Sequence, residues 1–115
     1  MNKVTNDTFS NVLNDHLNNN KIVAAISGRL HCENCHITKI NILNYLEKNP
    51  DTNIDFLYLD GSIDDILESS YYQMEELNEY PKTAIFISSK NLIFKEGILT
   101  EEDLYKIEKL KKNKL

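Results

Sequence analysis

The most informative segment of the sequence is IVAAISGRLHCENCH, residues 22–36. Its first five residues form a continuous apolar run of strand length, which is typical of a strand covered on both faces. Ser27 and Gly28 begin a loop, and a helix is expected to start near Cys32. The segment therefore predicts a buried strand that leads into a helix, with two cysteines where the helix begins.

The spacing Cys32-x-x-Cys35 is the main chemical motif of the chain. At a helix N-terminus, unpaired N–H groups and the positive end of the helix dipole stabilise a thiolate. The thiolate is the reactive form of cysteine. Cys32, at the terminus, could attack a substrate disulfide, and Cys35, one turn further on, could resolve the mixed disulfide. The motif predicts a redox-active pair.

Other chemistries use the same residues. His31, Cys32, Cys35 and His36 are four potential metal ligands, but zinc sites usually combine two separated ligand pairs and the sequence has no second pair. The string Cys32 to His36 also matches the covalent haem pattern C-x-x-C-H. A third alternative is that the cysteines are small buried hydrophobes with no chemistry. The redox pair is favoured because the motif lies between a strand and a helix.

The rest of the chain alternates between helical and strand patterns. Helices are expected around residues 9–17, 32–48, 62–77 and 100–110, and strands over residues 22–26, 54–59, 83–87 and 92–94. The order α-β-α-β-α-β-β-α indicates an α/β fold, with a mixed sheet flanked by helices on both faces.

Two local patterns give more detail. Thr100 and Asp103 form a capping box at the start of the last helix. In the second helix, the apolar side expected to face the core comprises Ile37, Ile40, Leu43 and Leu46.

Composition limits the function classes. The chain has 115 residues, which predicts a single domain over residues 1–115. Its 13 Lys and Arg against 18 Asp and Glu argue against nucleic acid as a partner. No apolar run approaches the length of a membrane span or of a signal peptide, so a cytoplasmic location is expected. In the cytosol, paired cysteines are more often catalytic or metal-binding than structural.

At this point the chain resembles the thioredoxin family over nearly its whole length. The resemblance is carried by the cysteine pair, by Pro81 ahead of a strand, and by four segments: residues 4–9, 22–26, 83–87 and 95–100. It implies the thioredoxin fold, with a central mixed sheet of four to five strands. It also implies thiol–disulfide exchange, with Cys32 as the attacking nucleophile and Cys35 as the resolving thiol.

The resemblance assigns further roles. Pro81 is the candidate cis-proline, and Tyr80 before it would offer backbone groups to an extended substrate peptide. No bound cofactor or metal is implied beyond the Cys32–Cys35 disulfide. The implied partners are protein or small-molecule disulfides and an upstream reductant, such as a thioredoxin reductase or a low-molecular-weight thiol.

The motif departs from the family's Trp-Cys-Gly-Pro-Cys-Lys. His31 and His36 flank the cysteines, Glu33 and Asn34 lie between them, and Ile26 stands where the family has a buried Asp. These four flanking and intervening residues are expected to tune the Cys32 thiolate, Glu33 by raising its pKa and so making the pair reducing. The departures also support an alternative: a thioredoxin-fold interaction or redox-sensing module without turnover, for example one like the accessory proteins encoded beside bacteriocin genes.

Overall fold

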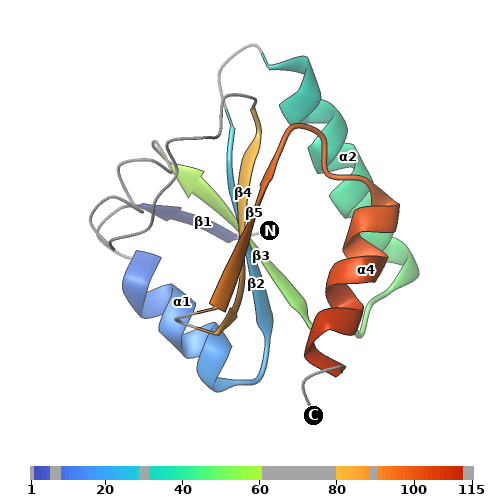
Figure 1. Ribbon diagram of the computed structural model, residues 1–115. Coiled ribbons are helices and arrows are strands. Elements are labelled where there is room, and N and C mark those ends of the chain that lie inside the picture. The colour runs from blue at the N-terminus through green and yellow to red at the C-terminus, as the bar shows by residue number, and fades with distance from the viewer. Residues whose placement is uncertain (1, 6–8, 29–31, 61–79, 89–90, 113–115) are drawn as a thin grey trace.

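A computed structural model describes most of the chain (Figure 1). The description covers residues 2–5, 9–28, 32–60, 80–88 and 91–112. Eight elements lie in these ranges: β1 (Asn2–Thr5), α1 (Phe9–Asn18), β2 (Ile22–Ser27), α2 (Glu33–Lys48), β3 (Ile54–Asp60), β4 (Lys82–Ser88), β5 (Asn91–Glu96) and α4 (Glu101–Lys112). The helix expected over residues 62–77 lies outside the described residues.

The strands form one mixed five-stranded sheet in the order β1-β3-β2-β4-β5. β1 and β2 both run parallel to β3, while β4 is antiparallel to β2 and β5 is antiparallel to β4. In Figure 1, α2 and α4 lie together on one side of the sheet and α1 lies on the other. The predicted α/β class and mixed sheet are confirmed.

Strand β1 is an addition to the predicted order. Its four residues are Asn2, Lys3, Val4 and Thr5, and Val4 pairs with Leu59 at the edge of the sheet. The sequence pattern missed this strand because a run with one apolar residue has no alternation to detect. The strand ends at Thr5, four residues before α1 begins.

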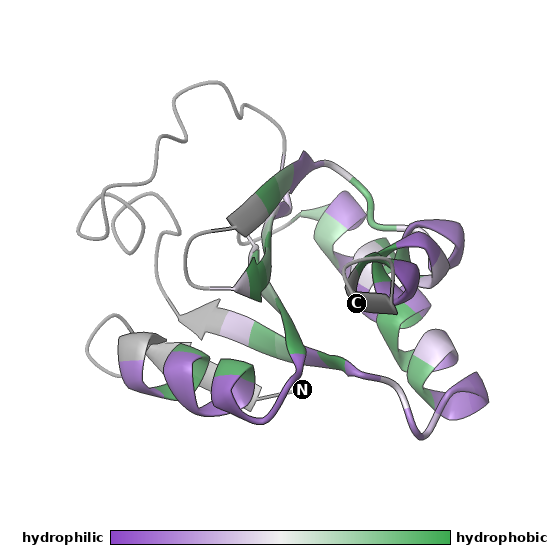
Figure 2. Cartoon of the chain, turned by 60° about the horizontal axis from the view of Figure 1, so that its bottom comes forward, coloured by the Kyte–Doolittle hydropathy of each residue, from purple (hydrophilic) through white to green (hydrophobic). Residues whose placement is uncertain are grey.

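The core lies mainly between the sheet and the pair α2 and α4. All six residues of β2 are buried. The apolar run predicted this for residues 22–26, whereas Ser27, expected to begin a loop, is the last residue of the strand. Figure 2 shows the hydrophobic colour gathered on the strands, while the helices carry hydrophilic residues. The main cluster combines side chains from the sheet, both helices and the segment before α4: Ile22, Ala24, Ile26, Ile42, Tyr45, Ile54, Phe56, Ile85, Leu99, Leu104 and Ile107.

The expected core face of α2 was partly wrong. Ile40 and Leu43 are 44% and 52% exposed, and the buried residues of the helix are Thr38, Ile42 and Tyr45. Thr38 can be buried because its hydroxyl accepts a hydrogen bond from the Leu99 N–H at 3.1 Å. The buried face of α2 therefore includes polar side chains that have hydrogen-bond partners, and it differs from the face that the apolar residues alone define.

Two local predictions near the C-terminus are confirmed. β4 and β5, expected as strands over residues 83–87 and 92–94, form a hairpin. The capping box begins α4: Thr100 N–H donates to Asp103 Oδ2 at 3.0 Å, and Asp103 N–H donates to Thr100 Oγ1 at 3.1 Å. Burial opposes the charge of Asp103, but the Thr100 hydrogen bonds and Lys95 outweigh it and lower the pKa of this carboxyl.

Candidate active site

The two cysteines lie where the sequence predicted, at the N-terminus of α2. Cys32 is the N-cap residue, with extended backbone angles, and Glu33 begins the helix. Cys32 and Cys35 form a disulfide, with their Cα atoms 5.2 Å apart, and both residues are half-buried. The predicted pair is therefore close enough to cycle between dithiol and disulfide with little movement of the backbone.

The two sulfur atoms have different surroundings. Cys32 Sγ accepts a hydrogen bond from the Cys35 backbone N–H at 3.0 Å. This N–H is one of the donors that a helix leaves unpaired at its start. In the reduced protein the same donor, together with the helix dipole, would stabilise a thiolate on Cys32. The local geometry therefore favours Cys32 over Cys35 as the nucleophile.

Pro81 lies at the same end of the central strands as the cysteine motif. It directly precedes β4, whose first residue, Lys82, pairs with Ser27 at the end of β2. The Tyr80–Pro81 peptide bond is cis, and the Pro81 carbonyl accepts a hydrogen bond from the Gly97 N–H at 3.0 Å. The Lys82 ammonium lies 4.9 Å from the centre of the Tyr80 ring, within cation–π range.

The residues expected to tune the thiolate are placed only by their position on α2. Glu33, Asn34 and His36 lie in its first turn and are exposed. His31 lies outside the described residues. The tuning roles therefore remain predictions.

Sequence reasoning missed Tyr58 as a neighbour of the motif. Tyr58 lies on β3 and pairs with Ile26 of β2, the buried residue that stands where the resemblance expects an Asp. A Cβ atom on Gly28 would lie 2.6 Å from Tyr58 Oη and 3.5 Å from Cys35 Sγ. The sheet thus brings a phenol towards Cys35 from a strand far away in sequence. The available signal was one polar aromatic residue within an apolar strand.

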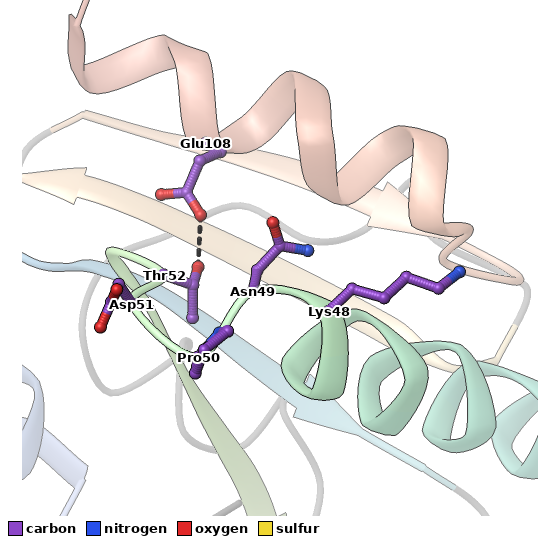
Figure 3. A pocket seen from close by; sticks show the side chains of 6 residues that line it. All are labelled: Lys48, Asn49, Pro50, Asp51, Thr52 and Glu108. Atoms are coloured by element: carbon purple, nitrogen blue, oxygen red, sulfur yellow. Dashed lines mark hydrogen bonds between the residues drawn. The ribbon is translucent and has the colours of Figure 1, made fainter.

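At the opposite end of α2 lies a pocket of about 270 Å³, whose lining residues are Lys48, Asn49, Pro50, Asp51, Thr52 and Glu108 (Figure 3). Glu108 of α4 accepts hydrogen bonds there from the Tyr45 hydroxyl at 2.7 Å, from the Asn53 N–H at 2.9 Å and from the Thr52 hydroxyl. Burial and the Glu108 contact raise the pKa of Tyr45 to about 12. Through these hydrogen bonds, Glu108 connects α4 to α2 and to the residues just before β3.

The described part of the chain contains neither a cluster of metal ligands nor a membrane-spanning helix. Within the described residues, no group of three or more His, Cys, Asp or Glu side chains is arranged to hold a metal ion. In the same part of the chain, no helix is both long and apolar enough to cross a membrane.

Comparison with known proteins shows which solved structures have a similar fold. No protein-family model matches the sequence, and a search of curated proteins finds no matching relative. Among solved structures, chloroplastic thioredoxin z is similar at 13% identity and a TM-score of 0.71, covering 98% of this chain and 95% of its own. The germline-specific thioredoxin Deadhead of Drosophila melanogaster is similar at 13% identity and a TM-score of 0.69, covering 96% and 98%.

A third structure links the fold to a partner. Thioredoxin f2, solved in complex with ferredoxin:thioredoxin reductase, is 22% identical to this chain with a TM-score of 0.64, covering 93% of this chain and 91% of its own. All three matches extend over almost the whole of both chains. Together with the sheet order and the position of the Cys32–Cys35 disulfide, they show that this chain has the thioredoxin fold.

Proposed function

We propose that this chain is a thiol–disulfide oxidoreductase that uses Cys32 as the nucleophile and Cys35 as the resolving thiol. The observation that carries the proposal is the hydrogen bond from the Cys35 N–H to Cys32 Sγ at the helix N-cap. This contact favours a thiolate on one sulfur of a pair that already forms a disulfide. The likeness to thioredoxins supports the same chemistry through the fold alone.

The reaction would proceed by two exchanges. The Cys32 thiolate attacks one sulfur of a substrate disulfide, forming a mixed disulfide and releasing the first substrate thiolate. Cys35 loses its proton and attacks Cys32 Sγ, which closes the Cys32–Cys35 bond and releases the second thiolate. Two electrons pass from the pair to the substrate. A dithiol reductant or two monothiols then regenerate the pair.

Substrate binding would use the end of the central strands beside the motif. Tyr80 and Pro81 precede the first residue of β4, next to the end of β2. A peptide in extended form could pair there with the backbone of Tyr80. The neighbouring Lys82 ammonium over the Tyr80 ring adds positive charge at this position.

We assign the reducing direction to the pair. Glu33, in the first turn of α2, places a carboxylate near the Cys32 thiolate and destabilises it. Asn34, His31 and His36 are assigned smaller tuning roles. A less stable thiolate makes the reduced pair the better electron donor. The chain would act as one domain in the cytoplasm, where thiols are kept reduced. Its reductant would be a reductase, as for the thioredoxin solved with one, or a small thiol.

The test is the reduction potential of the Cys32–Cys35 pair. The protein is equilibrated in dithiothreitol or glutathione buffers, and free thiols are trapped by alkylation and counted by mass spectrometry. We expect one two-electron transition near about −270 mV, in the range of reducing thioredoxins. A value near about −150 mV would reverse the direction, because it is typical of oxidants and isomerases.

Two results would reject the enzyme itself. If no intramolecular disulfide forms in any buffer, the redox proposal fails. If the pair cycles but a Cys35→Ser protein traps no partner through Cys32 in a cell extract, the non-turnover interaction or sensing module becomes the better description.

A further inference from the structure

We propose that the Tyr58 hydroxyl donates a hydrogen bond to Cys35 Sγ when this sulfur becomes a thiolate, so that Tyr58 is a catalytic residue of the exchange reaction. The inference rests on the proposed function, since it concerns the resolving half of the same cysteine pair. It adds a residue that comes from β3 rather than from the motif or its flanks.

The geometry beside Gly28 carries the proposal. Gly28 follows β2 directly, and Tyr58 lies on the neighbouring strand, in register with Ile26. A Cβ on Gly28 would lie 2.6 Å from Tyr58 Oη and 3.5 Å from Cys35 Sγ. The hydroxyl and the sulfur therefore face the same small space, which is open because residue 28 has no side chain.

The glycine at this position is explained by space. Among the described glycines, Gly97 has a positive φ of 80° and Gly28 does not. The backbone at residue 28 would therefore accept an alanine. A contact of 2.6 Å between a Cβ and the Tyr58 oxygen is too close, however, so the methyl group would push the hydroxyl away from its position. The absence of a side chain at Gly28 thus leaves room for the Tyr58 hydroxyl.

Other groups around Cys35 are less suited to this role. The Ile26 side chain beside Tyr58 is apolar and buried. Glu33 and His36, the charged or titratable side chains in the same turn of α2, are exposed. Thr83 of β4 also pairs with Ile26, and its buried hydroxyl has no hydrogen-bond partner within the described residues, Cys35 included.

A hydrogen-bond donor at Cys35 would assist the exchange by stabilising the leaving thiolate. When a reductant thiolate attacks Cys32 Sγ, a bond forms between these two sulfurs and the Cys32–Cys35 bond breaks. The electron pair moves to Cys35, which leaves as a thiolate and later takes a proton from solvent. A tyrosine hydroxyl keeps its proton at neutral pH and can donate to this anion. A hydrogen bond to a charged acceptor is shorter and stronger than a neutral one.

The first test measures the pKa of Cys35 directly. In a Cys32→Ser protein, Cys35 is the single thiol, and its rate of alkylation by iodoacetamide is followed against pH by mass spectrometry. Adding Tyr58→Phe should raise the Cys35 pKa by about one unit, because the anion loses one charge-assisted hydrogen bond. Tyr105→Phe, which removes an exposed tyrosine hydroxyl on α4, should leave it unchanged.

The second test uses the space at Gly28. Gly28→Ala should raise the Cys35 pKa as Tyr58→Phe does, because the methyl group displaces the hydroxyl. In a protein that already carries Tyr58→Phe, the same alanine should add nothing, since there is no hydroxyl left to displace. Independent, additive shifts would overturn the role given to Gly28, because they would mean that the alanine acts by another route.

The third test keeps both cysteines. Reduction of the Cys32–Cys35 disulfide by dithiothreitol at pH 7 should be several-fold slower in Tyr58→Phe, because a thiolate of higher pKa leaves more slowly. An unchanged Cys35 pKa and an unchanged reduction rate in Tyr58→Phe would refute the role of Tyr58. Such a result would leave the redox function intact, whereas failure of the parent protein to cycle at all would refute the proposed function.

Discussion

The two ends of helix α2 are held in place by different kinds of contact. At its N-terminus, the described contacts are a disulfide, one hydrogen bond to a sulfur and the first helical turn. At its C-terminus, the Asn49 N–H and its side-chain amide both donate to the Tyr45 carbonyl, while Glu108 joins Tyr45 to residues 52 and 53.

The difference follows from what each end must do. Polar groups at the C-terminal end are paired with one another, so that end can be rigid and fully hydrogen-bonded. The sulfurs at the N-terminal end must exchange partners, and permanent bonds would block that exchange. We therefore expect substitutions at the cysteine end to change redox chemistry with little loss of stability, and substitutions at the Glu108 end to do the reverse.

The largest expected effect is on chemistry. Cys32→Ser should reduce disulfide exchange with a model disulfide to background, because a serine hydroxyl cannot replace the thiolate nucleophile. Serine is also a good N-cap residue, so urea unfolding should differ from that of the reduced parent by less than about 1 kcal/mol. A folded Cys32→Ser protein that still exchanges disulfides would assign the nucleophile to Cys35 instead.

The next effect is on stability at the other end. Glu108→Ala should cost about 3 kcal/mol in urea unfolding, because it leaves the buried Tyr45 hydroxyl and the Asn53 N–H without their acceptor. The exchange rate of the folded protein should not change. Glu102→Ala, on the exposed side of the same helix, is the matched control and should cost less than about 0.5 kcal/mol. Equal costs for the two variants would contradict the importance of this junction.

A smaller effect should appear in alkaline solution. The pKa of Tyr45 is raised to about 12 in the folded protein, mainly by burial, above the value of about 10 expected when unfolded. Between these values the folded state binds the proton more tightly, so stability is complete below pH 10 and declines as the pH rises towards 12. From pH 9 to 11, the parent should lose about 1 kcal/mol more than Tyr45→Phe. Parallel curves for the two proteins would show that Tyr45 ionises without penalty.

The smallest effect concerns the charge beside the nucleophile. Glu33→Gln should lower the Cys32 pKa by a few tenths of a unit, because it removes a negative charge from the first turn of α2. The shift is small since Glu33 is exposed and water screens its charge. It is read from the pH dependence of Cys32 alkylation, with Glu47→Gln near the other end of the helix as the control. Absence of any shift would remove the charge argument for a reducing pair.

Several features could be predicted from local sequence because their causes are local. The apolar run of residues 22–26 indicates a buried strand, and the Thr100–Asp103 pair caps the start of α4 within four residues. The cysteine spacing of one helical turn similarly brings two sulfurs into reach. Each of these structures is determined by residues that are neighbours along the chain.

Other features were hidden because their partners are distant. The β1 strand exists because β3 offers it an edge. The buried side of α2 depends on a hydrogen bond that the Leu99 N–H donates to Thr38 Oγ1, 61 residues away in sequence. Glu108 and Tyr45 are 63 positions apart, and the residues around them give no sequence signal that the two side chains pair. Tyr58 approaches Cys35 only because β3 lies beside β2 in the sheet.

The sequence by itself determined the α/β class, the buried strand, the helix that follows it and the pair of cysteines at the start of that helix. These rest on hydrophobic periodicity and on short-range hydrogen bonding, which act within a few residues. Tertiary structure alone settled which side of α2 is buried, which carboxylate closes the far end and which hydroxyl faces Cys35. Such contacts depend on strand order and register, because these set the distance between residues that the chain keeps far apart.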